Sequence, residues 1–334
     1  MIENTNRTHI ITSNKMIIRQ QGNLDLYSLD SSGNPIQGDR TYIPIKSIDE
    51  LYILKKCVID TETLAFLADN NVLVHFHSRN TRYIGSFYPN SKASINKSGH
   101  VLLQQLRAFD DPSHRLYIAK QITYGHISNM FYNLKKYKIE NNLLELSQKA
   151  KQSESIQELM GFEGAAKKEY YSSWDKIIKD QKSFKFTIRS KRPPADKINV
   201  LISYLNSRIY NICLSEIYKT ELDPRISFLH EPNHRSISLH LDVAEIFKPL
   251  IGDNIIFNIL NKKILRAEHF VKKSGLWTLE TEGIKIIELH LIKKLSEINC
   301  INEMKLNYRF TILKEVNKIK KSLVEYAEYQ PFIK

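Results

Sequence analysis

Short runs in which apolar and polar residues alternate dominate the chain from Lys15 to about Tyr88. Alternation puts every second side chain on one face and predicts half-buried β-strands. The runs are MIIRQQGNLDLYSL, with a Gly22-Asn23 turn inside it, YIPIKSIDELYIL, VLVHFH and RYIGSFY, the last two joined by a polar turn as a hairpin. DTETLAFLADN predicts one short helix with an Asp60 or Thr61 cap. We therefore expect a small β-rich domain with one inserted helix.

After PNSKASINKSGH the apolar residues recur every three or four positions, which is typical of helices. Residues 101–150 predict two or three helices, and SIQELMGFEGAAKKEYYSSW continues the pattern. NYRFTILKEVNKIKKSLVEY predicts a basic amphipathic helix near the C-terminus. A long core helix is expected from Ala195, with this apolar stripe: Ile198, Leu201, Ile202, Leu205, Ile209, Ile212 and Cys213.

These periods predict an α+β protein. Residues 1–92 would form the small β-rich domain and residues 93–334 a larger all-α domain. No stretch approaches the roughly eighteen apolar residues of a membrane span, and MIENTNRTHI has no apolar signal core. We therefore expect a cytoplasmic protein with no membrane partner.

The cysteines and one pair of histidines do not form a recognisable motif. Cys57, Cys213 and Cys300 are odd in number and far apart, so reduced thiols in the core are expected. His75 and His77 would share a strand face, which permits a metal pair in principle. Because no carboxylate or cysteine accompanies them at ligand spacing, a packed or polar face is favoured.

Positive charge is concentrated in the second part of the chain. The formal net charge is +13, and residues 1–92 carry ten basic and nine acidic side chains, against 39 and 27 in the remainder. Such a field favours a polyanionic partner such as nucleic acid, although a solvated lysine-rich surface is the alternative.

Acids and imidazoles gather in FLHEPNHRSISLHLDVAEIFKP, residues 228–249. On a helix, Asp242 and Glu245 would project from one face, and Lys248 follows at the same interval. One interpretation is a salt-bridged surface. The other is a divalent metal site, to which a loop could bring His230.

Two further segments offer chemistry. Glu163 could supply another acid, and its neighbours Gly161 and Gly164 would let the backbone lie close to another element or to a ligand, or would only permit tight packing. In FTIRSKRPPADKIN, three basic residues suit phosphate contacts or form a plain basic loop: Arg189, Lys191 and Arg192.

The motifs LMGFEGAAKKEYY, RSKRPPADKIN and LDPRISFLHEPNHRSISLHLDVAEIFKPLIGDNI, in this order, resemble the CRISPR-associated protein 1 family, the metal-dependent endonuclease and integrase of CRISPR adaptation. VLVHFHSRNTRYIGSFYP, YGHISNMFYNLKKY and YQPF resemble it as well. The resemblance implies a β-rich N-terminal and a helical C-terminal domain, a homodimer that uses the β-rich domain for contacts, and a small second CRISPR adaptation protein as partner. It also implies insertion of double-stranded DNA by transesterification at a 3′-hydroxyl, with Mg²⁺ or Mn²⁺.

Carried over residue by residue, the resemblance makes Glu163, His230 and Glu245 the catalytic metal ligands. Asp242 matches a second acid near the site, and Lys248 matches a basic residue there. Departures from the family pattern bear on loop geometry and substrate preference: Glu221 and Ser227 in place of glycines, and Leu205 with Asn206 in place of Gly-Tyr.

Two other functions remain open at this point. A non-catalytic DNA-binding subunit would use the acids only in salt bridges. A metallophosphoesterase of another class, acting on small nucleotides, is disfavoured because the chain has no dense His/Asp motif and no Gly-rich nucleotide loop.

Overall fold

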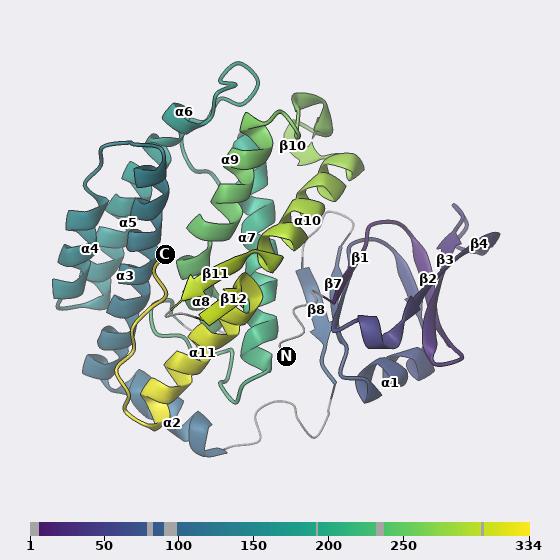
Figure 1. Ribbon diagram of the computed structural model, residues 1–334, viewed down its shortest axis with the longest axis horizontal. Helices are drawn as coiled ribbons and strands as arrows, with labels where there is room; N and C mark the ends of the chain where they lie inside the picture. The colour runs from purple at the N-terminus through teal and green to yellow at the C-terminus, as the bar shows by residue number, and fades with distance from the viewer. Residues whose placement is uncertain (1–6, 79–82, 90–98, 192, 232–236, 302–303) are drawn as a thin grey trace. The chain divides into compact units, whose positions relative to one another are not determined.

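The computed structural model describes residues 7–78, 83–89, 99–191, 193–231, 237–301 and 304–334 (Figure 1). The chain divides into two compact units, Met1–Ser94 and Ile95–Lys334. The boundary expected after residue 92 falls in a segment outside the described residues.

Two four-stranded sheets make up the N-terminal unit, which is strand-rich as predicted. In one sheet β1 and β7 lie parallel to β5, and β8 pairs antiparallel with β7. In the other, β3 lies antiparallel to both β2 and β4, and β6 pairs parallel with β2. The strand orders are β1 (Thr8–Ile11), β5 (Glu50–Ile53), β7 (Leu73–His77), β8 (Tyr83–Phe87) and β4 (Pro35–Pro44), β3 (Asn23–Leu29), β2 (Lys15–Gln20), β6 (Cys57–Ile59).

The inward faces of these strands share one apolar core, which includes Ile17, Leu24, Leu51 and Val74. One helical turn, η1 (Ile45–Ser47), and the helix α1 (Thr61–Asp69) complete the unit. Asp60 caps α1 by accepting a hydrogen bond from the Thr63 amide at 2.7 Å, as predicted.

The turn between β2 and β3 lies one residue earlier than expected. Gln21 and Gly22 have positive φ values of 46° and 78°, and Asn23 begins β3. Two residues with positive φ match the right-handed twist of the flanking strands. The Gly22-Asn23 turn was therefore wrong by one position, because the chain places Gln21 in the left-handed region.

His75 and His77 are packed side chains, as predicted. Both are buried, and the His75 ring stacks on Tyr52 with centroids 4.5 Å apart. The His75 Nδ1 atom also forms a hydrogen bond with the Ser86 hydroxyl at 2.5 Å.

The thiols are only partly as expected. Cys213 is free and buried in the helix α7 (Lys197–Tyr218), which confirms a core thiol. Cys57 is free but half-buried, and burial raises its pKa to about 12. The side chain of Cys300 lies outside the described residues.

The C-terminal unit is mostly helical, as predicted. Three helices, α2 to α4, account for most of residues 101–150 (Figure 1). The helix α7 packs against α8, α11 and η2. The helical segments are α2 (Gly99–Asp110), α3 (Pro112–Lys136), α4 (Leu143–Gln152), α5 (Ile156–Ser172), α6 (Trp174–Ile177), α7 (Lys197–Tyr218), α8 (Leu239–Phe247), the π-helical η2 (Pro249–Asp253), α9 (Asn254–Asn261), η3 (Ala267–His269), α10 (Thr281–Ser296) and α11 (Tyr308–Val324).

Two small hairpins interrupt this unit, so it is not entirely helical. They are β9 (Phe270–Lys273) with β10 (Leu276–Leu279), and β11 (Ile298–Ile301) with β12 (Met304–Asn307). Strands of four residues are too short for a period of two to stand out in the sequence.

The long helix α7 begins where the sequence predicts. Asp196 is its N-cap and accepts a hydrogen bond from the Asn199 amide at 2.7 Å. Every member of the predicted apolar stripe is buried. The helix therefore forms the apolar floor on which α8 and η2 pack.

The helix α3 is held to the C-terminal segment by its own polar side chains. The amide of Asn129 donates to the carbonyls of Ile246 and Phe332 at 3.0 and 2.9 Å. A Cβ atom on Gly125 would lie 2.7 Å from the Pro331 side chain. Only glycine at residue 125 permits this approach of the C-terminal segment to α3. Among the helices of the described residues, none combines the length and apolar character needed to cross a bilayer.

Alanine substitutions at two helical glycines should change stability in opposite directions. Gly125→Ala should lower the free energy of unfolding by roughly 1–3 kcal/mol, because the new methyl group overlaps Pro331. Gly164→Ala in α5 should raise it by about 0.5–1 kcal/mol, because its Cβ would meet nothing within 4 Å. Urea denaturation of both variants measures the difference. Equal effects of the same sign would contradict the close approach at Gly125.

Candidate metal centre

Two buried carboxylates and one imidazole meet between three helices of the C-terminal unit. Glu163 of α5, Glu245 of α8 and His126 of α3 each offer one ligand atom, and these atoms all lie within 4.8 Å of one another. The His126 Nδ1 atom lies 3.4 Å from an oxygen of each carboxylate. The structure thus brings together two of the three predicted ligands, Glu163 and Glu245.

Two lysines compensate the carboxylates. The Lys167 Nζ atom lies 2.8 Å from Glu163 and 3.4 Å from Glu245, and the Lys248 Nζ atom lies 2.6 Å from Glu245. Burial alone would raise the pKa of Glu163, but His126 and the Lys167 charge lower it to about 2. Burial opposes ionisation of Glu245 as well, and the charges of Lys167 and Lys248 hold its pKa well below the usual range. Both acids are therefore ionised at neutral pH.

The donor set fits a divalent metal. Among the described residues, Glu163 Oε1, Glu245 Oε2 and His126 Nδ1 are buried atoms whose contacts are the ion pairs with one another and with Lys167. Carboxylate oxygens with one imidazole suit Mg²⁺ or Mn²⁺. The alternative of a salt-bridged surface is right about the pairing of Glu245 with Lys248 but wrong about the surface, since Glu245 is 3% exposed and Asp242 0%.

Asp242 organises the loop that carries His230. Its two oxygens accept hydrogen bonds from the amides of Phe228, Leu229 and His230 at 2.7 to 3.1 Å. Oδ1 also lies 2.7 Å from the Nδ1 atom of His230. Because a carboxylate oxygen accepts, this contact favours a proton on Nδ1, and in the neutral ring Nε2 then carries the lone pair.

His230 is not a member of the group of three, although it belongs to the same electrostatic environment. Burial lowers its pKa, but the hydrogen bond and charge of Asp242, together with Glu245 and Glu163, raise the pKa above the usual value. The side chain is 30% exposed. His230 is therefore a partly exposed imidazole that is oriented by its contact with Asp242 and lies in the field of Glu163 and Glu245.

Sequence reasoning missed His126. The buried face of α3 contains Ile122, His126, Met130 and Asn133, at spacings of three and four. A histidine at an apolar position of a long helix was the available signal. Taken alone it also fits an ordinary core residue, so only the folded arrangement shows what it faces.

The glycines beside Glu163 do not support a close approach within the chain. Gly161 and Gly164 are exposed on α5, and a Cβ atom on either would meet nothing within 4 Å. Of the alternatives for these glycines, close approach to another element and tight packing are both wrong, and close approach to a ligand stays a prediction.

A basic pocket of about 440 Å³ opens beside the carboxylates. Glu245, Lys167 and Lys248 line it together with the predicted phosphate contacts Arg189 and Lys191. Arg192 lies outside the described residues.

Arg189 is positioned by the start of α7. Its guanidinium donates to Asn199 at 2.9 Å and to the Ser203 hydroxyl at 3.1 Å. These bonds use some of the five N–H donors of the guanidinium and hold the side chain in the pocket wall. Asn206, one of the departures from the family pattern, lines the same pocket.

The other departures are accommodated locally. The Ser227 hydroxyl donates to the His230 carbonyl at 2.5 Å and contacts the Ser238 hydroxyl at 2.8 Å, so it helps to close the histidine loop. Leu205 is buried on the core face of α7. Glu221 pairs with Lys320 at 2.5 Å.

A third buried acid, Asp253 of η2, borders the pocket. The Tyr170 hydroxyl donates to it at 3.0 Å. Burial raises the pKa of Asp253 to about 7, against the opposing effects of Tyr170, Lys248 and Arg189. Between the usual pKa of an aspartate and pH 7, the folded state therefore binds one proton more than the unfolded state.

Asp253→Asn should change how stability depends on pH. The native acid contributes stability at low pH that is lost as the pH rises toward 7, because the unfolded chain then releases its proton first. Relative to the wild type, the variant should gain up to roughly 4 kcal/mol in free energy of unfolding between about pH 4 and pH 7.5. Denaturant titrations across this range measure the gain. A difference that stays constant with pH would contradict the buried, protonated acid.

Most of the chain, including the residues of the metal centre, matches known proteins. The family model described as "CRISPR associated protein Cas1" matches residues 9–310. A protein of Thermodesulfovibrio yellowstonii named CRISPR-associated endonuclease Cas1 2 is 39% identical over 307 residues, covering 88% of this chain and 91% of that protein.

Solved structures show the same fold. A Cas1 protein from Thermotoga maritima superimposes with a TM-score of 0.83 at 32% identity, covering 95% of this chain and 97% of that one. A casposase bound to integration product gives a TM-score of 0.84 at 20% identity, covering 98% and 93%, and this likeness shows the fold alone. With a family model that spans most of its length and close relatives over nearly all of it, the chain belongs to the CRISPR-associated protein Cas1 family.

Proposed function

We propose that the protein is a metal-dependent DNA endonuclease and integrase that inserts new spacers into a CRISPR array. The observation that carries the proposal is the buried pair of ionised carboxylates, Glu163 and Glu245, beside imidazole and a basic pocket. An acidic site inside a basic protein is what phosphodiester chemistry needs, since the acids hold a cation while surrounding cations hold phosphates. The names of the curated relatives support endonuclease activity.

Glu163, Glu245 and His230 would hold Mg²⁺ or Mn²⁺. The bound ion would offset charge on the phosphate and lower the pKa of the attacking hydroxyl or water. His230 is the proposed imidazole because Asp242 orients its ring, as an acid behind a ligating histidine does. His126 is the second candidate, since its Nδ1 atom already lies beside both carboxylates.

The chain's other residues would bind and position the DNA. Arg189 and Lys191 line the pocket and would contact phosphates, as would the neighbouring Arg192. Lys248, fixed on Glu245, would keep the second carboxylate ionised and offer a donor to the substrate. A 3′-hydroxyl as nucleophile gives integration, and water gives cleavage.

The partners we propose are double-stranded DNA, a second copy of the chain that contacts it through the β-rich unit, and a small second CRISPR adaptation protein. A spacer has two ends, and a homodimer would present one site to each of them. Integration is carried to this chain from the family to which it belongs.

Isosteric changes at the three acids should separate a ligand from a positioning residue. Glu163→Gln and Glu245→Gln should abolish cleavage and integration of a branched DNA with Mn²⁺. Asp242→Asn should retain activity reduced by about ten- to a hundredfold, because it orients His230 without holding the metal. Thermal melting of each variant controls for folding.

The two histidines are distinguished by metal affinity. His230→Ala should weaken Mn²⁺ binding by more than about tenfold, measured by calorimetry, whereas His126→Ala should weaken it less. The reverse order would assign the imidazole position to His126. Unaltered Mn²⁺ affinity in Glu245→Gln would favour a DNA-binding subunit without catalysis.

DNA binding should be sequence-independent and strongly dependent on salt. If about five phosphates are neutralised, the logarithm of the association constant should fall with the logarithm of salt concentration at a slope of about −4 to −5. Fluorescence anisotropy with two unrelated duplexes measures both properties. Glu163→Gln should bind as tightly as the wild type, and loss of DNA affinity in that variant would contradict separate roles for acids and cations.

A further inference from the structure

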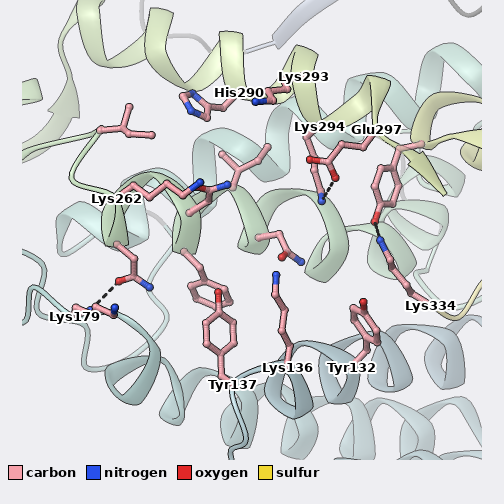
Figure 2. A pocket seen from close by; sticks show the side chains of 17 residues that line it. Tyr132, Lys136, Tyr137, Lys179, Lys262, His290, Lys293, Lys294, Glu297 and Lys334 are labelled. Atoms are coloured by element: carbon pink, nitrogen blue, oxygen red, sulfur yellow. Dashed lines mark hydrogen bonds and ion pairs between the residues drawn. The ribbon is translucent and has the colours of Figure 1, made fainter.

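A second and larger pocket, of about 710 Å³, opens between the end of α3, the helices α9 and α10, and the C-terminal segment (Figure 2). It shares no lining residue with the pocket of the metal centre. Lysines dominate its walls: Lys136, Lys179, Lys262, Lys293, Lys294 and Lys334.

These lysines are poorly compensated. Glu297 is the one acid among the residues that line the pocket, and it pairs with Lys294 at 2.6 Å. Within the described parts of the chain, Lys136, Lys262 and Lys293 form no ion pair with an acid, and neither does Lys179. Such a cluster repels itself and therefore favours an anion in its centre.

The positive charges are close enough to affect one another. Burial lowers the pKa of Lys334, and the neighbouring charges of Lys294 and Lys136 lower it further against the effect of Glu297. The Lys334 Nζ atom donates to the Tyr308 hydroxyl at 3.1 Å, which holds the side chain at the pocket wall.

The lysines converge from opposite walls. Figure 2 shows Lys136 extending from α3 toward the space that Lys294 of α10 enters from the other side. Lys262, directly after α9, extends into the same space. Tyr132 of α3 and Tyr137, the residue directly after α3, point into the same space. Charges that surround a volume suit a compact ligand, whereas an extended strand on a surface would be followed by charges in a row. The volume is typical of sites for small molecules.

We infer that this lysine pocket is a second anion site, which binds a compact ligand carrying two or more phosphate groups. Ammonium groups from several directions can each pair with a different phosphate oxygen. The tyrosine rings and the amide of Asn258 supply neutral contacts on the same walls. A free polyphosphate and the end of a nucleic-acid strand both have this chemistry. The inference goes beyond the proposed function and does not depend on the metal centre.

Charge reversal at two adjacent lysines gives a matched test. Lys136 lines the pocket and Lys135 does not, while both are exposed in the last turn of α3. Lys136→Glu and Lys135→Glu therefore change net charge and helix-end electrostatics equally. Calorimetry with inorganic tripolyphosphate should show an affinity at least about tenfold weaker for Lys136→Glu and nearly unchanged for Lys135→Glu.

Binding of a 20-base-pair duplex, measured by fluorescence anisotropy, distinguishes a free polyphosphate from the end of a nucleic-acid strand as the ligand. Loss of tripolyphosphate binding alone in Lys136→Glu assigns the site to a free polyphosphate. Loss of both ligands, with tripolyphosphate competing against the duplex in the wild type, assigns it to a nucleic-acid strand. Equal affinities of the two variants for both probes, or no binding of either probe to the wild type, would overturn the inference. Mn²⁺-dependent cleavage measured beside these titrations tests the proposed function separately.

Discussion

The structure of the helical unit depends on the burial of two neighbouring carboxylates, Glu163 and Glu245. Ionised acids so close together repel, and an uncompensated buried charge costs several kcal/mol. Lys167 supplies the opposite charge from α5, and Lys248 supplies it from the residue directly after α8. The acids are thereby ionised in advance, so a cation can be bound without first removing protons.

A network of buried, hydrogen-bonded polar side chains fixes the positions of the helices that carry these acids. Asn133 of α3 donates to the Pro249 carbonyl at 2.6 Å and to the Tyr170 hydroxyl at 2.9 Å, and it accepts from Asn254 at 2.8 Å. One side chain therefore joins α3, α5 and the segment after α8. Because each of these groups would be costly to bury alone, the network permits essentially one relative placement of the three helices. That placement sets the separation of Glu163 and Glu245.

The sequence predicted what depends on repeated local patterns. The stripe of α7 and the N-cap Asp60 of α1 follow from periodicity and side-chain chemistry and were confirmed. The family motifs indicated that Glu163 and Glu245 belong together, and the fold brings them together. Burial of Asp242 under three backbone amides could not be predicted, because the loop at 228–230 has no period. His126 was missed for a related reason: helical periodicity shows that it is inward but not what it faces.

The π-helical segment Pro249–Asp253 has a consequence for comparing helices across this junction. The Asp253 amide bonds to the Lys248 carbonyl five residues back, so one extra residue is accommodated in the turn between α8 and α9. One residue corresponds to a rotation of about 100°. A single helical wheel drawn through both helices would therefore mix two faces, one that carries Glu245 and Lys248 and one that carries Asn258 and Asn261. Because of this rotation, α8 directs Glu245 toward the metal centre, while α9 directs Asn258 and Asn261 toward the lysine pocket.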